Sequence, residues 1–577
     1  MAQRSRRRRV AEKREIFSQW AEEEGVSVSA LLGYLLYLEN WNLDKHLANV
    51  GWRIFMKEEE VIGLPRVTIE EAIWLLERSF MSQAVYLELR LRFKDRIFFP
   101  AVMNIRAENK RHRPILEEYK HGVRAHLMEC LSLTLSERLK FLDLSGLAQD
   151  SIQVFFKMSW GLDGSGDHAD YHQLSKVSYN TKAVMSVCFA LREVRVVDGR
   201  NESVSWSSKV DGANRPQNTR PLAVFPSQES KESEFIPLVE AEVKTVEELG
   251  VEVKAEDDCI QTVATCEKCS MSMIDGKMVT NLLNLGGAFC TMCSKSQKDC
   301  HNPDVIEAGF VIERDVQGIR DLALSLTDED TGEIKKKKGD YQTRQGVCGV
   351  PITESDLTKS FPVCHSKIRS FQWVVELLTR LKSHKKWATP TNCVRYEKEE
   401  TENYKKMWEE LKELIYQNLA INIGNPGDMV TGKAFVNFAS DSSRAFFVSL
   451  VDEMEKEDLD IILLGLCAVV KVINSQKRKV NVEKLRILAQ EVNMKIVTTF
   501  PWAAISPSVH RILAHSWEVI EMNDGFGLGD VSEEGLEALN KLIRQMRTHG
   551  ARKNSTVNNF QVIGFRNVEI YTFACPL

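Results

Sequence analysis

The sequence lacks several features that would define a protein class at once. It has no apolar run long enough to cross a lipid bilayer, and its first residues, MAQRSRRRRV, lack the apolar core of a secretory signal peptide. We therefore expect an intracellular, soluble protein with no membrane partner. The net charge is only -5 over 577 residues, so the composition as a whole carries no nucleic-acid signature. No internal repeat of useful period is present.

The length and composition are those of a large globular protein. A chain of 577 residues can bury several cores and predicts roughly three or four domains. Hydrophobic residues make up 43% and charged residues 27%, which argues against disorder over most of the length. The 13 cysteines are an odd number. In a reducing compartment we expect such thiols to be buried, catalytic or metal-bound rather than paired in disulfides.

Basic residues gather in short runs despite the low net charge. These runs are Arg4–Arg9, Leu89–Arg96, Arg106–Arg113 and Lys335–Lys338. Each run fits either a solvated surface or a segment that contacts phosphates or directs nuclear import. Several such runs in one chain favour a nucleic-acid ligand.

Helical periodicity dominates the beginning and the later part of the chain. Apolar residues recur at helical spacing in residues 12–42, 68–100 and 133–146, and we expect the last of these helices to end near Gly146. From about Pro303 to Phe500 the pattern is again mostly helical.

Strand patterns begin at Ser151 and predict a β-rich core. Residues 151–167 and 183–197 are rich in β-branched and aromatic residues, and each segment stops in a glycine-containing turn. Residues 198–233 are rich in Ser, Asn, Gln and Pro and predict a loop or peripheral excursion. Residues 261–285 predict a strand, a turn at Asp275 and a helix.

Two aspartates stand where predicted strands end, Asp163 in SWGLDGSGD and Asp275 in SMIDGKM. Carboxylates at strand ends project from a rigid edge and can share divalent metal ions, as two-metal phosphoryl chemistry requires. Each Asp-Gly pair also fits a simple turn. The pair therefore needs corroboration.

Cysteine pairs suggest a zinc site. Two C-x2-C pairs occur close together: Cys266, Cys269, Cys290 and Cys293. Spacing alone predicts a zinc ribbon made of all four. However, the first pair lies on the predicted strand that leads to Asp275, and His510 and His515 have a zinc-compatible H-x4-H spacing. We therefore prefer a Cys2His2 site made of the second cysteine pair and these histidines over the ribbon, or over unrelated buried thiols.

Two further pairs have competing interpretations. His168 and His172 have the i, i+4 spacing of a helical metal site, but they fit a loop contacting DNA or substrate at least as well. Cys364 beside His365 could be mistaken for a nucleophile and its base. Adjacent residues seldom face each other, so we do not expect a thiol enzyme.

The segment after the histidines predicts a helix with an acidic face. Asp530 or Ser532 can cap a helix that runs to about His549, with Gly550 as its C-terminal stop. The residues that share one face of it are Glu534, Glu537, Asn540 and Lys541. This face offers an acidic metal ligand in polar surroundings, although a surface Glu-Lys pair is the simpler interpretation.

An ordered series of segments resembles one protein family. The segments are DGSGDHADYHQ, IDGKMVTNLLN with the following CTMC, GNPGDMVTGKAF, and VHRILAHSWEVIE followed by SEEGLEALNKLIRQMR. They resemble the Transib transposases and the related catalytic subunit of the V(D)J recombinase. The series extends from about Ile97 to Lys553 in the order of the family, whereas the tail after Lys553 departs from its pattern.

The resemblance implies a mixed α+β fold. It consists of an RNase H-like core, in which helices flank a mixed sheet, with a large helical, zinc-bound insertion and helical N-terminal regions. Asp163 is preferred to Asp167 as the first catalytic aspartate because of its place at the strand end. The implied sites are a catalytic triad holding two Mg²⁺ or Mn²⁺ ions, Asp163, Asp275 and Glu537, and one structural Zn²⁺ held by Cys290, Cys293, His510 and His515.

The resemblance also implies a domain order. The expected parts are a basic N-terminal module that binds terminal-repeat DNA (1–75), a helical dimerisation and DNA-binding region (76–150), the RNase H-like core with both aspartates and the zinc cysteines (151–300), a helical insertion (301–505), a segment with the zinc histidines and the glutamate helix (506–555), and a divergent tail (556–577).

The implied function is that of a nuclear cut-and-paste DNA transposase. Such an enzyme works as a homodimer on terminal inverted repeats, nicks DNA, forms hairpins on the flanking DNA and joins 3′-OH ends to target DNA. The main alternative is a domesticated, catalytically inactive zinc-containing DNA-binding protein. A third interpretation is a zinc-ribbon adaptor. The sequence does not predict whether an accessory protein is needed.

Overall fold

The computed structural model divides the chain into two compact units, residues 1–113 with 566–577, and residues 114–565. Apart from isolated positions between 72 and 104, it describes residues 114–140, 142–144, 147, 152–165, 183–207, 218–226, 234–254, 261–286, 289–296, 298–328, 334, 345–383, 398–424, 440–476 and 478–549. In the first unit, Tyr86 is buried and its hydroxyl donates a hydrogen bond to the Pro100 carbonyl at 3.0 Å. All elements named below belong to the second unit.

Several features singled out in the sequence lie outside the described residues. They are the basic runs at 4–9, 106–113 and 335–338, most of the run at 89–96, nearly all of the module at 1–75, Asp167, His168, His172, Gly550, the GNPGDMVTGKAF segment after its first residue, and the tail at 556–577. What was expected of them stays a prediction.

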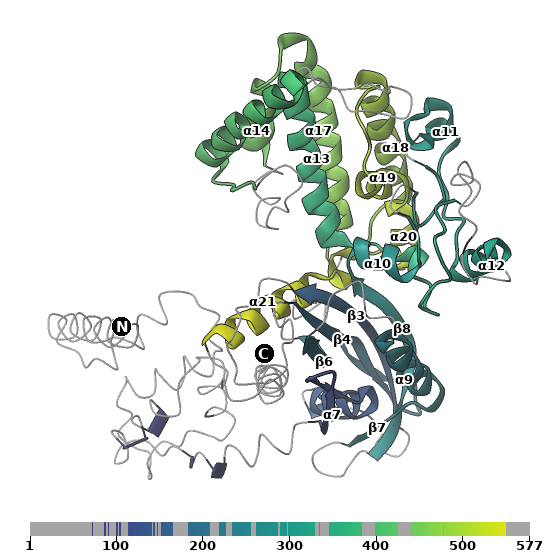
Figure 1. Ribbon diagram of the computed structural model, residues 1–577. Helices are drawn as coiled ribbons and strands as arrows, with labels where there is room; N and C mark the ends of the chain where they lie inside the picture. The colour runs from purple at the N-terminus through teal and green to yellow at the C-terminus, as the bar shows by residue number, and fades with distance from the viewer. Residues whose placement is uncertain are drawn as a thin grey trace. The chain divides into compact units, whose positions relative to one another are not determined.

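A mixed sheet forms one half of the second unit (Figure 1). Its strands are β1 (Leu116–Tyr119), β2 (Gly122–Ala125), β3 (Gln153–Ser165), β4 (Val184–Val197), β5 (Ser203–Ser207), β6 (Thr219–Pro226), β7 (Val251–Lys254) and β8 (Gln261–Ile274). The order is β1-β2-β6-β4-β3-β8-β7, and β5 pairs with β4 beside this path. Only the β3–β8 pairing is parallel among these strands.

Alternating apolar residues explain the central strand. Every second residue of β3 is buried in the series Val154, Phe156, Met158, Trp160 and Leu162. This period of two places one row of side chains on a single face of the sheet. The helices α7 (Leu127–Lys140) and α9 (Phe235–Leu249) pack against the strands and against each other.

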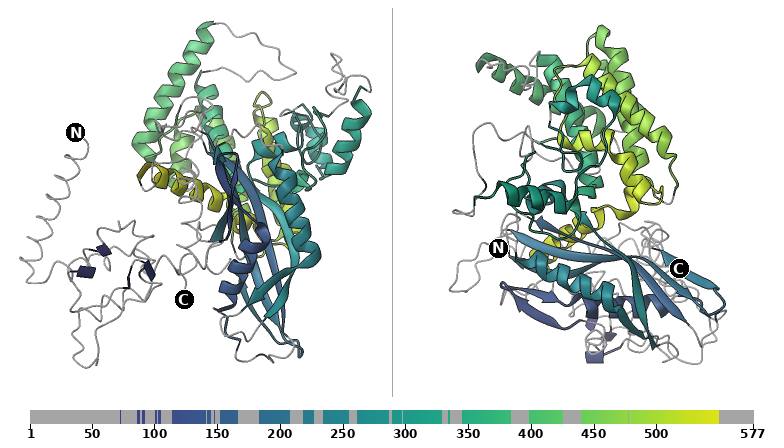
Figure 2. Two further views of the ribbon diagram at one scale, coloured as in Figure 1. Left: turned by 60° about the horizontal axis from the view of Figure 1, so that its bottom comes forward. Right: turned by 90° about the vertical axis from the view of Figure 1, so that its right-hand side faces the viewer.

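Helices make up the other half of the unit. They are α10 (Gly276–Leu282), α11 (Pro303–Ala308), α12 (Val316–Leu326), α13 (Val363–Ser383), α14 (Lys398–Leu419), α16 (Asp441–Ser449), α17 (Glu453–Ile473), α18 (Val482–Thr499), α19 (Pro507–Ala514), α20 (Ser516–Met522) and α21 (Glu534–His549). Figure 2 shows most of them gathered beyond the end of the sheet where β8 leads into α10, whereas α21 packs against β3 and β6. No helix in the described part of the chain is both long and apolar enough to cross a membrane.

The structure confirms the mixed α+β class and corrects several local predictions. Residues 198–233 are not only a loop, because they contain β5 and the buried strand β6. Pro221 in β6 stands at the irregularity of the β4–β6 pairing, where a missing N–H is tolerated. The region 76–150, expected to be helical, contains the hairpin β1–β2, and α7 ends at Lys140 rather than near Gly146.

Two bulges set the register of the parallel pair. Between the Val154↔Ala264 and Leu162↔Ile274 pairs, β8 contains two more residues than β3. The second bulge lies opposite Gly161, where an added Cβ would stand 1.8 Å from the Met273 carbonyl oxygen. Only glycine allows the two backbones to approach this closely.

Replacing Gly161 tests this register. We expect Gly161→Ala to destabilise the protein by about 3 kcal/mol, because its Cβ meets rigid backbone rather than a movable side chain. The free energy of unfolding is followed by thermal or urea denaturation. The control is Gly318→Ala in α12, where the Cβ meets only the Asp315 side chain at 3.3 Å. Equal stability of the two variants would contradict the close approach.

Candidate functional site

Asp163 and Asp275 are neighbours at the end of the parallel pair. They directly follow Leu162 and Ile274, which are partners in the β3–β8 register. Asp275 also caps α10, and its Oδ1 accepts a hydrogen bond from the Met278 N–H at 2.5 Å. Both carboxylates are thereby carried by rigid backbone.

Glu537 reaches the same place from α21. Ser532 Oγ accepts a hydrogen bond from the Glu534 N–H at 3.4 Å at the start of this helix, which extends to His549, the last described residue. Asn540, one turn after Glu537, donates a hydrogen bond from Nδ2 to Asp163 Oδ2 at 2.6 Å. The helix is thus tied to the strand that carries the first aspartate.

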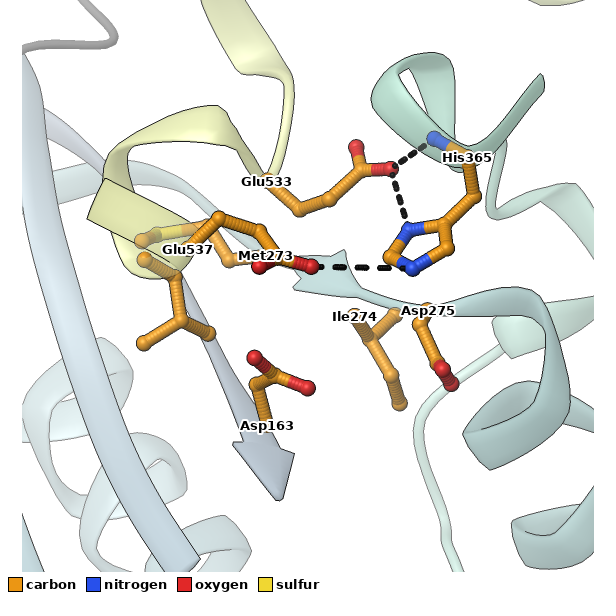
Figure 3. Close-up of a pocket in the computed structure, with 8 residues that line it drawn as sticks. Asp163, Met273, Ile274, Asp275, His365, Glu533 and Glu537 are labelled. Carbon is orange, nitrogen blue, oxygen red and sulfur yellow. Dashed lines mark hydrogen bonds and ion pairs between the residues drawn. The ribbon is translucent and has the colours of Figure 1, made fainter. Parts of the chain in front are cut away.

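One pocket brings the three carboxylates together with two further ionisable residues, His365 and Glu533, and three apolar ones (Figure 3). It is lined by Asp163, Met273, Ile274, Asp275, His365, Glu533, Leu536 and Glu537. His365 Nδ1 lies 3.1 Å from Glu533 Oε1, and its Nε2 lies 3.6 Å from Glu537 Oε1. The imidazole therefore bridges two glutamates that stand one helical turn apart.

The carboxylates in this pocket repel one another, which helps to raise the pKa values of Asp163 and Glu537. Burial, together with the charges of Glu537 and Asp275, raises the pKa of Asp163 well above its usual range. Burial also raises the pKa of Glu537, with His365 opposing and Glu533 and Asp275 adding to the shift. Carboxylates that repel each other at close range favour a divalent cation or a proton between them.

The charge state of His365 follows from the same surroundings. Burial disfavours its charged form, but the hydrogen bond and charge of Glu533, together with the charges of Asp275 and Glu537, raise the pKa of His365 to about 9. Near neutral pH the ring is therefore an imidazolium, which offsets part of the negative charge of the carboxylates.

A second cluster has the geometry of a metal site. Its potential ligand atoms all lie within 4.8 Å of one another, and all four residues are buried: Cys290, Cys293, His510 and His515. Among the described residues this is the only group of three or more such side chains that meets this criterion. The predicted Cys2His2 grouping is confirmed, and it can bind a metal such as zinc.

The local backbone structure brings the four side chains of this cluster together. The Met292 N–H donates a hydrogen bond to Cys290 Sγ at 3.4 Å within a tight turn. His510 lies on α19, and its Nε2 is 3.3 Å from Cys293 Sγ. His515 stands between α19 and α20, so one short helical segment presents both imidazoles.

The surroundings of His515 fit a bound metal. Its Nδ1 lies 2.9 Å from Glu518 Oε2, and the other oxygen of Glu518 accepts a hydrogen bond from the Ile312 N–H at 2.9 Å. The remaining ring nitrogen, Nε2, is buried and has no hydrogen-bond partner in the described part of the chain. A carboxylate on one imidazole nitrogen and a free second nitrogen facing thiols is the arrangement of a zinc-ligating histidine.

The cysteine chemistry also fits. Burial opposes ionisation of Cys290, but its interactions with the neighbouring Cys293 thiol and with the imidazoles of His510 and His515 bring the pKa of Cys290 well below its usual range. A thiolate is the form that binds zinc. The donor set of two thiols and two imidazoles matches a structural tetrahedral site.

The competing sequence interpretations are not favoured by the geometry. Cys266 and Cys269 lie on β8 and are not part of the Cys2His2 cluster, which argues against a four-cysteine ribbon. Cys364 is buried, and burial raises the pKa of its thiol, so it is poorly suited to act as a nucleophile.

Three contributing residues escaped the sequence analysis. The sequence could have indicated Glu518 as a partner of His515, because it follows His515 by one helical turn in HSWE. The indication for Glu533 was weaker: it precedes Glu537 by four residues, a spacing that places two side chains close together on a helix. His365 was noticed only beside Cys364, and nothing local connects it with Glu533, which lies 168 positions away in the chain.

Zinc content distinguishes the two ligand sets. We expect the purified protein to carry about one zinc per chain, and Cys293→Ser and His510→Ala to lose it, because each removes one ligand of a four-ligand site. Cys266→Ser should keep the metal. Elemental analysis after gel filtration measures this, and loss of zinc in Cys266→Ser with retention in His510→Ala would support the ribbon instead.

Glu518 provides a finer test of the same site. Removing the carboxylate that orients a metal-bound histidine typically costs about 10–100-fold in metal affinity, so we expect Glu518→Ala to weaken zinc binding by that factor. Competition with a chromophoric chelator measures the change. Glu521→Ala, which alters an exposed residue of the same helix, serves as the control. Equal affinities in the two variants would exclude an orienting role.

Comparison with known proteins does not assign a function to either site. No protein-family model matches the chain, and no curated protein matches it. The proposal for the function therefore depends on the resemblance of the sequence segments and on the geometry described above.

Proposed function

We propose that the protein is a DNA transposase that cuts and joins DNA by two-metal-ion phosphoryl transfer, as the resemblance to the Transib family implies. The observation that carries the proposal is the convergence of Asp163, Asp275 and Glu537 on one pocket from three distant parts of the chain. Three carboxylates around a shared space are the ligand set that such chemistry requires.

The topology supports an RNase H-like core. Strands β6, β4 and β3 are antiparallel neighbours, and β8 then adds parallel to β3. The aspartates stand at adjacent positions of β3 and β8, and the helix α21 packs against β3 with the glutamate. This is the placement of catalytic carboxylates that the proposed core requires.

The triad would hold two Mg²⁺ or Mn²⁺ ions, which supply the activation of water or a 3′-OH and the stabilisation of the leaving oxygen. The residues of the chain orient the ligands: Asn540 holds Asp163 by a hydrogen bond, and His365 faces Glu537. Lys541 and Arg544 are exposed on α21 beyond Glu537, where cationic side chains suit a phosphate backbone.

The Cys2His2 cluster would hold one structural Zn²⁺ within the helical insertion. It joins the turn at Cys290 and Cys293, which follows α10, to the segment at His510 and His515, which precedes α21. Asp275 begins the first of these segments and Glu537 lies in the helix after the second. Zinc would therefore fix the path of the chain that delivers the glutamate to the aspartates.

Double-stranded DNA, both terminal inverted repeats and target DNA, is the proposed substrate of a nuclear homodimer. The basic runs that favour this lie outside the described residues, so this part is carried by the resemblance and by the pocket. A domesticated DNA-binding protein without cleavage activity is the alternative. The presence of all three carboxylates in one pocket favours the enzyme.

Cleavage of labelled DNA tests the proposal. The substrate is a duplex with the terminal repeat that flanks the coding sequence, incubated with the full chain and Mg²⁺ or Mn²⁺. We expect nicked and hairpin products that require the metal. Glu537→Gln should reduce them by more than the roughly 10–100-fold typical of outer-shell changes, because it removes a metal ligand.

Glu521→Gln, on the exposed face of α20, is the matched control and should cleave like the wild type. Specific DNA binding without products from any of these proteins would instead support the domesticated alternative.

A further inference from the structure

Glu533 is a fourth carboxylate of the pocket and lies just before α21. Its side chain is almost fully buried, since the residue is only 2% exposed. Oε1 accepts a hydrogen bond from the His365 backbone N–H at 3.0 Å and lies 3.1 Å from His365 Nδ1. Oε2 is also buried, but it has no hydrogen-bond partner among the described residues. An unsatisfied buried carboxylate oxygen costs free energy, so stability alone does not account for a glutamate here.

The imidazole of His365 connects Glu533 to the catalytic pocket. With Nδ1–H donated to Glu533, the ring orientation is fixed and Nε2 faces Glu537 Oε1 at 3.6 Å. The backbone hydrogen bond to the same Glu533 oxygen holds the start of α13 in place as well. The ring could turn away from Glu537 if this carboxylate were absent.

We propose that Glu533 is a positioning residue that acts through His365 to hold Glu537 over Asp163 and Asp275. This inference rests on the proposed function, because it concerns the ligand geometry of the same pocket. Asp163 and Asp275 are fixed by strand backbone, whereas the side chain of Glu537 is 41% exposed on a helix. Glu537 is thus the member of the triad whose carboxylate needs an additional restraint.

The neighbouring glutamate offers a matched comparison. Glu534 pairs with Lys367 of α13, and Lys367 Nζ also donates a hydrogen bond to Asn474 Oδ1 at 3.0 Å. This contact joins the same two helices as the Glu533–His365 contact, but it does not line the pocket. Removing the Glu534 side chain therefore weakens only the packing of α21 on α13. Removing the Glu533 side chain weakens that packing and also frees the His365 ring.

The test compares DNA nicking by Glu533→Ala and Glu534→Ala in Mg²⁺ and in Mn²⁺. We expect Glu533→Ala to lower kcat by about 10–100-fold in Mg²⁺ with an unchanged KM for DNA. Mn²⁺ should restore part of this loss, because Mg²⁺ demands near-ideal octahedral geometry. Glu533→Gln, which keeps an acceptor for His365, should fall between Glu533→Ala and the wild type. Glu534→Ala should keep the wild-type ratio of the Mn²⁺ and Mg²⁺ rates.

Zinc content and thermal unfolding of each variant verify the fold, and Glu533→Gln takes the place of Glu533→Ala if the latter does not fold. Equal losses in Glu533→Ala and Glu534→Ala with an unchanged metal ratio would overturn the inference, since Glu533 would then only dock the helix.

Binding of Mn²⁺ without DNA separates this inference from the proposed function. We expect the full chain to bind Mn²⁺ in a way that Glu537→Gln abolishes, Glu533→Ala weakens and Glu534→Ala leaves unchanged, as followed by electron paramagnetic resonance. If the wild type binds Mn²⁺ in this pattern but cuts no DNA, the proposed function fails while the positioning role stands. Mn²⁺ binding that is equal in Glu533→Ala and the wild type, or absent in the wild type, overturns the positioning role.

Discussion

The parallel pairing of β3 with β8 is the constraint on which the rest of the candidate site depends. The two strands have different numbers of residues over the same length, and two bulges in β8 absorb the difference. Gly161 permits the second bulge because its missing Cβ leaves room for the Met273 carbonyl. The consequence appears one residue after the last pair, where Asp163 and Asp275 stand side by side rather than out of register.

The helical region brings a third carboxylate, that of Glu537, to this edge of the sheet. The chain leaves the sheet after Asp275, and α21 is the helix that packs against β3 again and carries Glu537. Two connections restrain the return. The Cys2His2 cluster joins the beginning of the excursion to its end, and the start of α13 holds the start of α21 through His365 and Lys367. The second connection acts directly at the start of the helix that carries Glu537, whereas the first joins the segments that follow Asp275 and precede α21.

Local patterns in the sequence predicted the elements that carry the site but not the contacts that complete it. The strands β3, β4 and β8 and the helix α21 follow from period and turn residues alone. The ligand spacings C-x2-C and H-x4-H predicted a cluster that the structure brings together. In contrast, β6 was missed because its prolines and polar flanks hide a short apolar strand, and its pairing with β4 is a tertiary property. The contact between His365 and Glu533 joins residues 168 positions apart, so no local pattern encodes it.

The pocket therefore combines two rigidly held carboxylates, Asp163 and Asp275, with one adjustable carboxylate, Glu537. The positions of Asp163 and Asp275 are set by the register of the sheet, and a change there would disturb the fold as a whole. Glu537 is set by side-chain contacts on a helix, and its raised pKa reflects the repulsion that it meets from Asp275 and Glu533 as well as its burial. His365 faces the Glu537 carboxylate, while Asp275 and Glu533 repel it. A cation that entered the pocket would offset this repulsion and compete with His365 for the carboxylate, so the Glu537 side chain could shift. The fold thus keeps the strand-borne carboxylates fixed and leaves the position of the glutamate to a contact that an arriving cation would change.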